Sequence, residues 1–313
     1  MERRFSMQQF LAAAGSSFRA RGTVASASSG ATRAVRAVIF AAFAVLLAAC
    51  STSETLRTAV PAPVPTSTSP RYAAIVIDGH TGRVLHAANA DQTRFPASLT
   101  KMMTLYMLFE AMERGQVTRD TQIPFSAYAA ARPPSKLGFR PGQTIDVDTA
   151  IRALATKSAN DVATAVAEFL GGSESQFAAA MTAKAREIGM TSTVFRNPHG
   201  LPDPAQITTA RDMAVLSAAL RRRFPNQYGY FGAQSFAFRG GTVRGHNRVL
   251  ETVRGADGIK TGYTRASGFN LATSVSRDGR RLVAVVMGED SAAKRNAHME
   301  DLVERFLPVA TRR

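Results

Sequence analysis

A serine and a lysine three residues apart could supply a nucleophile and its base. Ser98 and Lys101 open a stretch, 99–113, whose apolar residues recur at helical spacing, so both side chains share one helix face. A serine hydroxyl attacks a carbonyl only when a neighbour takes its proton, and a lysine amine can do so only when uncharged. Burial and a second cation both lower a lysine pKa. We therefore expect Lys101 to be buried beside another cation, at a helix N-terminus that favours negative charge on the attacked carbonyl.

The spacing of Ser98 and Lys101 is not distinctive by itself, because Ser291 and Lys294 repeat it. We interpret that second copy as an exposed pair on a helix. The first copy is followed, 60 residues after its serine, by Ser158-Ala159-Asn160, and 102 residues after Ser158 by Lys260-Thr261-Gly262. Serine two residues before asparagine and Lys-Thr-Gly each occur once in the chain. Their order and spacing predict that the three segments form one site.

The three segments match the signature of class A β-lactamases and penicillin-binding proteins. Over residues 71–310 the chain resembles the low-molecular-mass penicillin-binding proteins that are D-alanyl-D-alanine carboxypeptidases. The similarity extends to the segments FPASLTKMMT, KSAND, VFRNPHGL, TTARDMA and DGIKTGYT. It implies a serine-type hydrolase that removes the terminal D-alanine of peptidoglycan stem peptides through an acyl-enzyme, uses no cofactor and is acylated by β-lactams such as penicillins.

The resemblance also implies a role for each catalytic residue. Ser98 is expected to be the nucleophile and Lys101 its general base. Ser158 is expected to relay the proton towards the leaving amine, and Asn160 to position Lys101 and the substrate backbone.

A second group of residues is expected to bind the substrate along one strand. By resemblance, the cation of Lys260 and the hydroxyl of Thr261 hold the terminal carboxylate, and Lys260 also helps to keep Lys101 neutral. Gly262 and Tyr263 continue this strand, and the N–H of Tyr263 is expected to form the oxyanion hole with that of Ser98. The resemblance implies a distal charge from Arg295 in the closing helix, whereas we expect a solvated helix arginine there.

Several alternatives are disfavoured or left open. A class A β-lactamase needs a Glu-x-x-Leu-Asn element between the second and third motifs, and none is present, so slow deacylation of penicillins is expected. The five histidines lack the spacing of a metal site, and His199 is expected to make a structural hydrogen bond in a loop.

A nucleic-acid partner is disfavoured despite the net charge of +16, because the chain is expected to be exported. A D,D-endopeptidase acting on cross-links and a non-catalytic penicillin-binding scaffold remain open, as does the oligomeric state.

The elements that must position these residues suggest an α+β fold. Strand patterns at both ends of the globular region enclose a mainly helical centre, which predicts an antiparallel sheet flanked by helices, with a mainly helical subdomain, as in β-lactamases and D,D-peptidases. The predicted strands are 72–77, 83–88, 258–263, 269–276 and 281–287. The predicted helices are 99–113, 147–155, 161–170, 175–188, 209–220 and 292–306.

The first 70 residues predict export and attachment. Arg33 and Arg36 precede a run of 13 apolar residues that ends at the single cysteine, Cys50, in a sequence that resembles a lipoprotein cleavage site. We therefore expect a signal peptide at 1–49, a lipidated Cys50 with a Ser/Thr/Pro-rich tether at 50–70, and a catalytic domain at 71–313. Because little sequence follows the last helix, a membrane anchor is expected at Cys50, with the protein in the periplasm.

Overall fold

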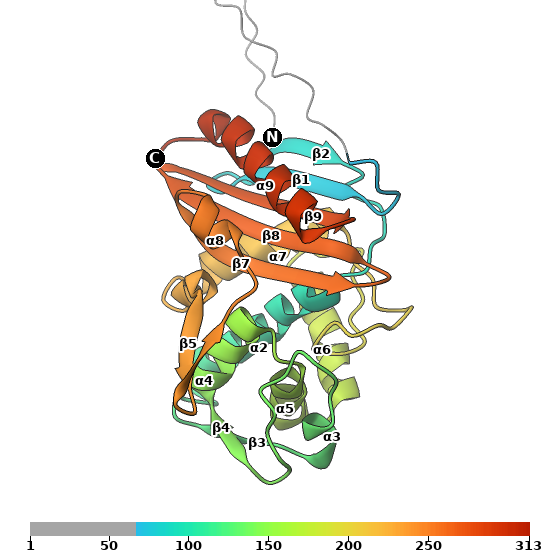
Figure 1. The fold of residues 1–313 in the computed structure, drawn as a ribbon, viewed down its shortest axis with the longest axis vertical. Helices are drawn as coiled ribbons and strands as arrows, with labels where there is room; N and C mark the ends of the chain where they lie inside the picture. Colours follow the sequence, from blue (N-terminus) through green and yellow to red (C-terminus); the bar gives the residue numbers. More distant parts are fainter. Residues whose placement is uncertain (1–66) are drawn as a thin grey trace, which may run out of the picture. The chain divides into compact units, whose positions relative to one another are not determined.

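The computed structural model describes residues 67–313, and its centre is a five-stranded antiparallel sheet in the order β2-β1-β9-β8-β7. The expected signal peptide, Cys50 and the tether up to residue 66 lie outside the described residues. The strands span Ala73–Asp78 (β1), Val84–Ala88 (β2), Ala256–Thr264 (β7), Gly268–Arg277 (β8) and Arg280–Glu289 (β9). β1 pairs with β9, so the two ends of the described chain are joined in the middle of the sheet (Figure 1).

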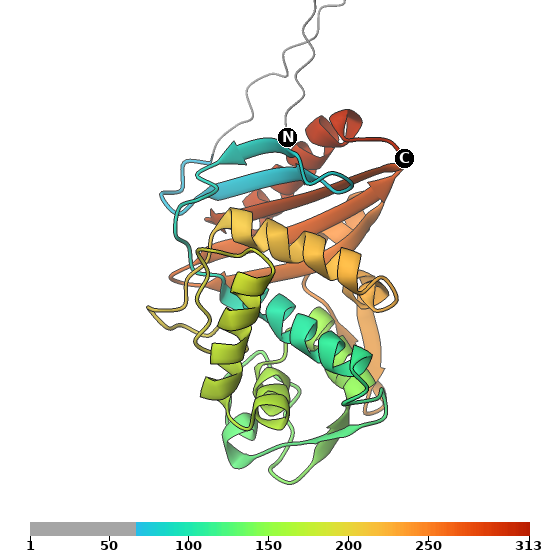
Figure 2. The same ribbon diagram turned by 180° about the vertical axis from the view of Figure 1, so that it is seen from behind.

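The sheet separates two hydrophobic cores because alternate residues of each strand point to opposite faces. In β9, Val283, Val285 and Met287 belong to the larger core, whereas Leu282 and Val286 belong to the smaller one. Helix α9 (Ala292–Phe306) covers the smaller core, and helix α7 (Ala210–Arg223) packs on the other face, as Figures 1 and 2 show. Burial on both faces explains why these strands read as nearly continuous apolar runs.

The central part of the chain forms the helical region below the sheet (Figure 1). Its principal helices are α2 (Lys101–Glu113), α4 (Val147–Arg152), α5 (Asn160–Gly171) and α6 (Glu174–Glu187). A single 3₁₀ turn, η1 (Ala97–Thr100), leads into α2, and a π-helical turn, η2 (Ala153–Lys157), leads out of α4. Met102 and Met103 of α2 are fully buried in the larger core. Within residues 67–313, no helix has the length and apolarity needed to cross a membrane.

The predicted strands and long helices are confirmed, with differences of a few residues at their ends, and so is the α+β class. The sequence prediction omits several short elements: α3 (Ala127–Ala130), α8 (Val249–Thr252), the turns η3 (Tyr228–Gly232) and η4 (Leu307–Val309), and the hairpins β3–β4 (Gln122–Pro124, Thr144–Asp146) and β5–β6 (Ser235–Phe238, Gly241–Arg244). Each is three to five residues long, too short for a periodic pattern to be visible.

Candidate active site

The backbone holds Ser98 between two glycine-containing segments. Ser98 lies in η1, directly before α2, and Ala97 adopts a left-handed backbone (φ 49°). Gly200 packs so closely that a Cβ there would lie 1.9 Å from the carbonyl oxygen of Ala97. A Cβ on Gly262, in β7, would lie 3.0 Å from the backbone nitrogen of Ser98. The turn that carries Ser98 is therefore in direct contact with the backbone of the Gly200 loop on one side and with the backbone of strand β7 on the other.

Lys101 is fully buried, and three oxygens surround its amine. Nζ lies 3.1 Å from Ser98 Oγ, 2.7 Å from Asn160 Oδ1 and 2.6 Å from the backbone oxygen of His199. The Asn160 side chain is oriented by Nδ2, which donates to the carbonyl of Pro133 at 3.0 Å. An amide oxygen and a carbonyl accept but cannot donate, so they use both hydrogens of a neutral amine. When the amine is neutral and these two acceptors take its two hydrogens, its lone pair is directed at the hydroxyl of Ser98, the geometry that a general base needs.

Burial and a neighbouring lysine favour this neutral amine. Burial lowers the pKa of Lys101 well below its ordinary value and the charge of Lys260 lowers it further, while Asp161 opposes both. Burial also lowers the pKa of Lys260 to about 7, with a contribution from Arg295. The pKa of Arg295 is itself lowered to about 10 by burial. The expectation that Lys101 is buried beside a second cation is thus confirmed.

Ser158 and Asn160 lie at a tight change of chain direction that places Asn160 against Lys101. The π-helical turn η2 ends at Ser158, whose backbone is left-handed (φ 63°), and α5 begins two residues later at Asn160. Ser158 Oγ is buried and makes no hydrogen bond within the described residues. A buried hydroxyl without a partner is costly, and here it remains available to a bound molecule.

A cleft of about 450 Å³ runs between the edge strand β7 and the helical region. Six of the eight predicted site residues within the described chain line it: Ser98, Ser158, Asn160, Thr261, Gly262 and Tyr263. Lys101 and Lys260 lie behind this lining, at 0% and 2% exposure. Lys260 Nζ donates to the backbone oxygen of Thr261 at 3.1 Å. The three motifs therefore converge on one cleft, with the two lysines buried in its wall; Cys50 lies outside the described residues.

Arg295 is not solvated, so that expectation is wrong. Its exposure is 4%, and it lines the cleft while donating to Asn270 O and Asn296 Oδ1. The buried face of α9 explains this position, because Arg295 shares it with Met299, Leu302, Val303 and Phe306. The i, i+4, i+7 spacing of this face is visible in the sequence and could have identified a buried arginine.

His199 makes the expected structural hydrogen bond, accepting at Nδ1 from the N–H of Leu201 at 3.1 Å. It also lines the cleft, and its carbonyl contact with Lys101 was not predicted. A backbone carbonyl has no side-chain signature, so residue types could not indicate this contact. His246 is a further cleft residue that the sequence analysis did not assign. Among residues 67–313, no three histidine, cysteine or acidic side chains come together as a metal site would require.

Comparisons with known proteins agree on one family. The Peptidase S11 profile, described as D-alanyl-D-alanine carboxypeptidase, matches residues 60–291. The D-alanyl-D-alanine carboxypeptidase DacA of Escherichia coli (strain K12) is 34% identical over 267 residues, 83% of this chain and 66% of the relative. The solved structure of the carboxypeptidase DacD from Francisella tularensis has a TM-score of 0.74 at 30% identity, over 78% of this chain and 71% of that one.

A further neighbour was solved with an antibiotic bound. Penicillin-binding protein D2 from Listeria monocytogenes, in a cefotaxime-bound form, has a TM-score of 0.66 at 28% identity, over 74% of this chain and 95% of that one. The chain spans 60 to 66% of the length of the first curated relatives that it matches.

Proposed function

The chain belongs to the Peptidase S11 family of D-alanyl-D-alanine carboxypeptidases, and on that premise we propose that it removes the terminal D-alanine of peptidoglycan stem peptides. The observation that carries this proposal is the buried Lys101 amine, with two acceptor-only oxygens and one hydroxyl around it. This arrangement supports activation of a serine for attack on an acyl group.

The reaction would proceed in two halves at Ser98. Lys101 takes the hydroxyl proton as Oγ bonds to the carbonyl between the two D-alanines. The carbon–nitrogen bond then breaks, and a proton returned through Ser158 Oγ leaves with D-alanine as its amine. Water hydrolyses the remaining ester, which releases the shortened peptide and restores the hydroxyl.

The sheet edge and the nucleophile turn would hold the substrate. An extended peptide along β7 can form backbone hydrogen bonds, and the N–H groups of Ser98 and Tyr263 would stabilise the oxyanion. Support for this pairing is the close packing of Gly262 on the amide of Ser98. Thr261 and the cations of Lys260 and Arg295 would bind the terminal carboxylate, and Arg295 supports this by lining the cleft without an acidic partner in any described contact.

Penicillins are proposed to acylate the same serine and to be released slowly. The cefotaxime-bound state of the Listeria neighbour supports β-lactam binding. None of the described residues that line the cleft carries a carboxylate, so a carboxylate base for deacylation is not among them. Rapid turnover of benzylpenicillin by the purified protein would contradict this part of the proposal.

The protein is proposed to act in the cell envelope, held by a lipid on Cys50 after removal of residues 1–49. The apolar run before Cys50 and the peptidoglycan substrate support this location. A Cys50→Ser variant should leave the membrane fraction, and its retention there would argue for an uncleaved anchor.

The decisive test uses purified pentapeptide and cross-linked dimer muropeptides, with mass spectrometry of the products. Loss of one D-alanine from the pentapeptide supports the carboxypeptidase, and cleavage of the dimer instead supports the D,D-endopeptidase. Covalent labelling by a fluorescent penicillin without either product would support the non-catalytic scaffold. Ser98→Ala should abolish both D-alanine release and labelling, and surviving label would refute the assigned nucleophile.

A further inference from the structure

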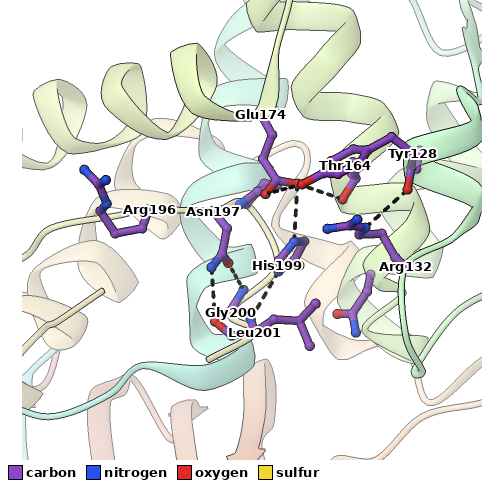
Figure 3. A network of polar contacts seen from close by, with 12 residues as sticks. Tyr128, Arg132, Thr164, Glu174, Arg196, Asn197, His199, Gly200 and Leu201 are labelled. Atoms are coloured by element: carbon purple, nitrogen blue, oxygen red, sulfur yellow. Dashed lines mark hydrogen bonds and ion pairs between the residues drawn. The ribbon is translucent and has the colours of Figure 1, made fainter. Parts of the chain in front are cut away.

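The imidazole of His199 is held in one protonation state. Its Nδ1 accepts a hydrogen bond from the N–H of Leu201, so the single proton of the neutral ring lies on Nε2. Nε2 faces Glu174 Oε2 at 3.4 Å, a long electrostatic contact (Figure 3). The side chain is 3% exposed. Within the described residues Nε2 makes no hydrogen bond, and the Glu174 carboxylate is the acidic group that lies beside it.

Glu174, at the start of α6, is fixed by a second layer of contacts. Thr164 Oγ1 donates to Oε2 at 3.2 Å, and the hydroxyl of Tyr128 donates to Oε1 at 3.4 Å (Figure 3). The guanidinium of Arg132 lies 3.7 Å from the centre of the Tyr128 ring. Burial raises the pKa of Glu174, but His199, Arg132 and Thr164 together bring it below its ordinary value, so Glu174 is a carboxylate.

The titratable groups that act on the ring are Glu174 of α6, Lys101 of α2 and Arg132 of the segment after α3. Burial lowers the pKa of His199 and Glu174 opposes this, while Arg132 adds to the lowering, as does Lys101 when it carries a charge. The pKa of His199 therefore stays below its ordinary value, which agrees with a neutral ring whose Nδ1 accepts a hydrogen bond.

The ring is connected to the base through a short loop. Asn197 Oδ1 accepts from the N–H of Gly200 at 2.7 Å, and Asn197 Nδ2 donates to the carbonyl of Leu201 at 3.1 Å. With the bond from Leu201 to the imidazole, these contacts close the 197–201 loop on itself (Figure 3). Two carbonyls of this loop contact α2: that of Pro198 accepts from Thr104 Oγ1 at 2.6 Å, and that of His199 lies 2.6 Å from Lys101 Nζ.

We propose that His199 and Glu174 are a positioning pair for Lys101: they hold the loop so that the carbonyl of His199 occupies one hydrogen of the amine and leaves the lone pair directed at Ser98. The inference rests on the proposed function, since it concerns the acylation of Ser98. Neither side chain touches the reacting atoms. An error of about 1 Å in the placement of a catalytic group can cost roughly 100-fold in rate, so a loop contact of this kind can matter.

The test measures acylation by a fluorescent penicillin under pre-steady-state conditions, separating the binding constant from the acylation rate constant. His199→Ala should lower the acylation rate constant about 10- to 100-fold with little change in binding. His199→Asn, whose side-chain oxygen can still accept from the N–H of Leu201, should recover to within about threefold of the parent. His199→Gln places its amide nearer Glu174, so its acylation rate constant should stay as low as that of His199→Ala. Glu174→Gln should lower the acylation rate constant about threefold to tenfold.

Rates are expressed per labelled site, with labelling counted by mass spectrometry and folding followed by thermal unfolding. His80→Ala, at a surface turn remote from the cleft, is the matched control and should acylate as the parent does. Acylation within twofold of the parent in His199→Ala would overturn the proposal. Equal rates for the Asn and Gln variants would also overturn it, even if the Ala variant does not fold. Failure of the parent protein to label at all would instead refute the proposed function.

Discussion

Two helices of this protein begin with serine and lysine in the same spacing, and only one of the two pairs is built for chemistry. At α2, Ser98 Oγ lies beside the amine of a fully buried Lys101. At α9, Ser291 is the N-cap, its Oγ accepts from the backbone N–H of Lys294 at 3.1 Å, and the side chain of Lys294 is 62% exposed beside Asp290. One hydroxyl is used to cap a helix, whereas the other remains available.

The difference shows that the sequence spacing only brings a serine and a lysine close together. The burial and the hydrogen-bond partners of the lysine determine whether it can act as a base. An exposed ammonium keeps its proton because water solvates it. The amine of Lys101 is removed from water, its pKa is lowered further by the charge of Lys260, and Asn160 Oδ1 and the His199 carbonyl oxygen can accept its hydrogens. Only the second environment has the burial and the acceptors that the proposed nucleophile and base require.

Removal of each lysine is the strongest way to test this contrast. Lys101→Met should lower acylation by penicillin about 10²- to 10⁴-fold, the usual contribution of a general base, because the Ser98 proton loses its acceptor. Lys294→Met should leave the rate unchanged. The measurement is the acylation rate constant of each purified variant. Comparable losses in both variants would contradict the contrast.

A negative charge beside Lys101 should stop its amine from acting as a base at neutral pH. Asn160→Asp replaces an amide oxygen 2.7 Å from Lys101 Nζ with a carboxylate, which stabilises the ammonium and raises the pKa of Lys101. Acylation at pH 7 should fall about 10- to 100-fold, and activity should recover as the pH rises. A pH profile of the acylation rate measures this shift, and an unshifted acid limb would show that Asn160 does not tune the base.

The buried cations should also make stability depend on pH. Lys260 binds its proton with a pKa of about 7 in the folded chain and near its ordinary value when unfolded, so the unfolded state holds more protons between these values. The free energy of unfolding should therefore rise from pH 7 to 9.5, by up to about 1.4 kcal/mol per pH unit for this group. Lys260→Met should reduce the rise seen in denaturant titrations. An equal rise in the free energy of unfolding in the parent and in Lys260→Met would show that a group other than Lys260 releases the proton.

The smallest effect on acylation is expected for the Ser291–Lys294 pair. Ser291→Ala removes an N-cap and should cost about 1 kcal/mol, a fall in melting temperature of roughly 2–4 °C. Penicillin acylation should stay within about twofold of the parent, because capping of the first turn does not set the position of buried Arg295. A large loss of acylation without a change in melting temperature would show that the start of α9 is coupled to the cleft.

The sequence was informative wherever a pattern was long or a side chain carried the chemistry. Strands β1, β8 and β9 were predictable from their apolar runs, and helices α2, α7 and α9 were predictable because apolar residues recur in them at helical spacing. Ser98, Lys101, Ser158 and Asn160 were predictable from motif order. All of these are properties of residue types.

What could not be predicted depends on the path of the backbone. The left-handed conformation of Ser158 and the carbonyl of His199 beside Lys101 have no counterpart in side-chain type. The short hairpins were missed because they contain too few residues to show a period. Arg295 is different: the apolar stripe of its helix was visible, and charge was given too much weight against it.

Gly200 and Gly262, which pack on the turn that carries Ser98, limit the substitutions by which this protein could become resistant to an inhibitor. A methyl group on Gly200 would collide with the carbonyl of Ala97, and one on Gly262 would crowd the amide of Ser98. A compound that draws its affinity from the peptide groups at Gly200 contacts backbone that a side chain there could not change without displacing the turn that carries Ser98. At Gly262 a side chain would require the amide of Ser98 to shift, so substitution there would alter the turn as well as the inhibitor contact.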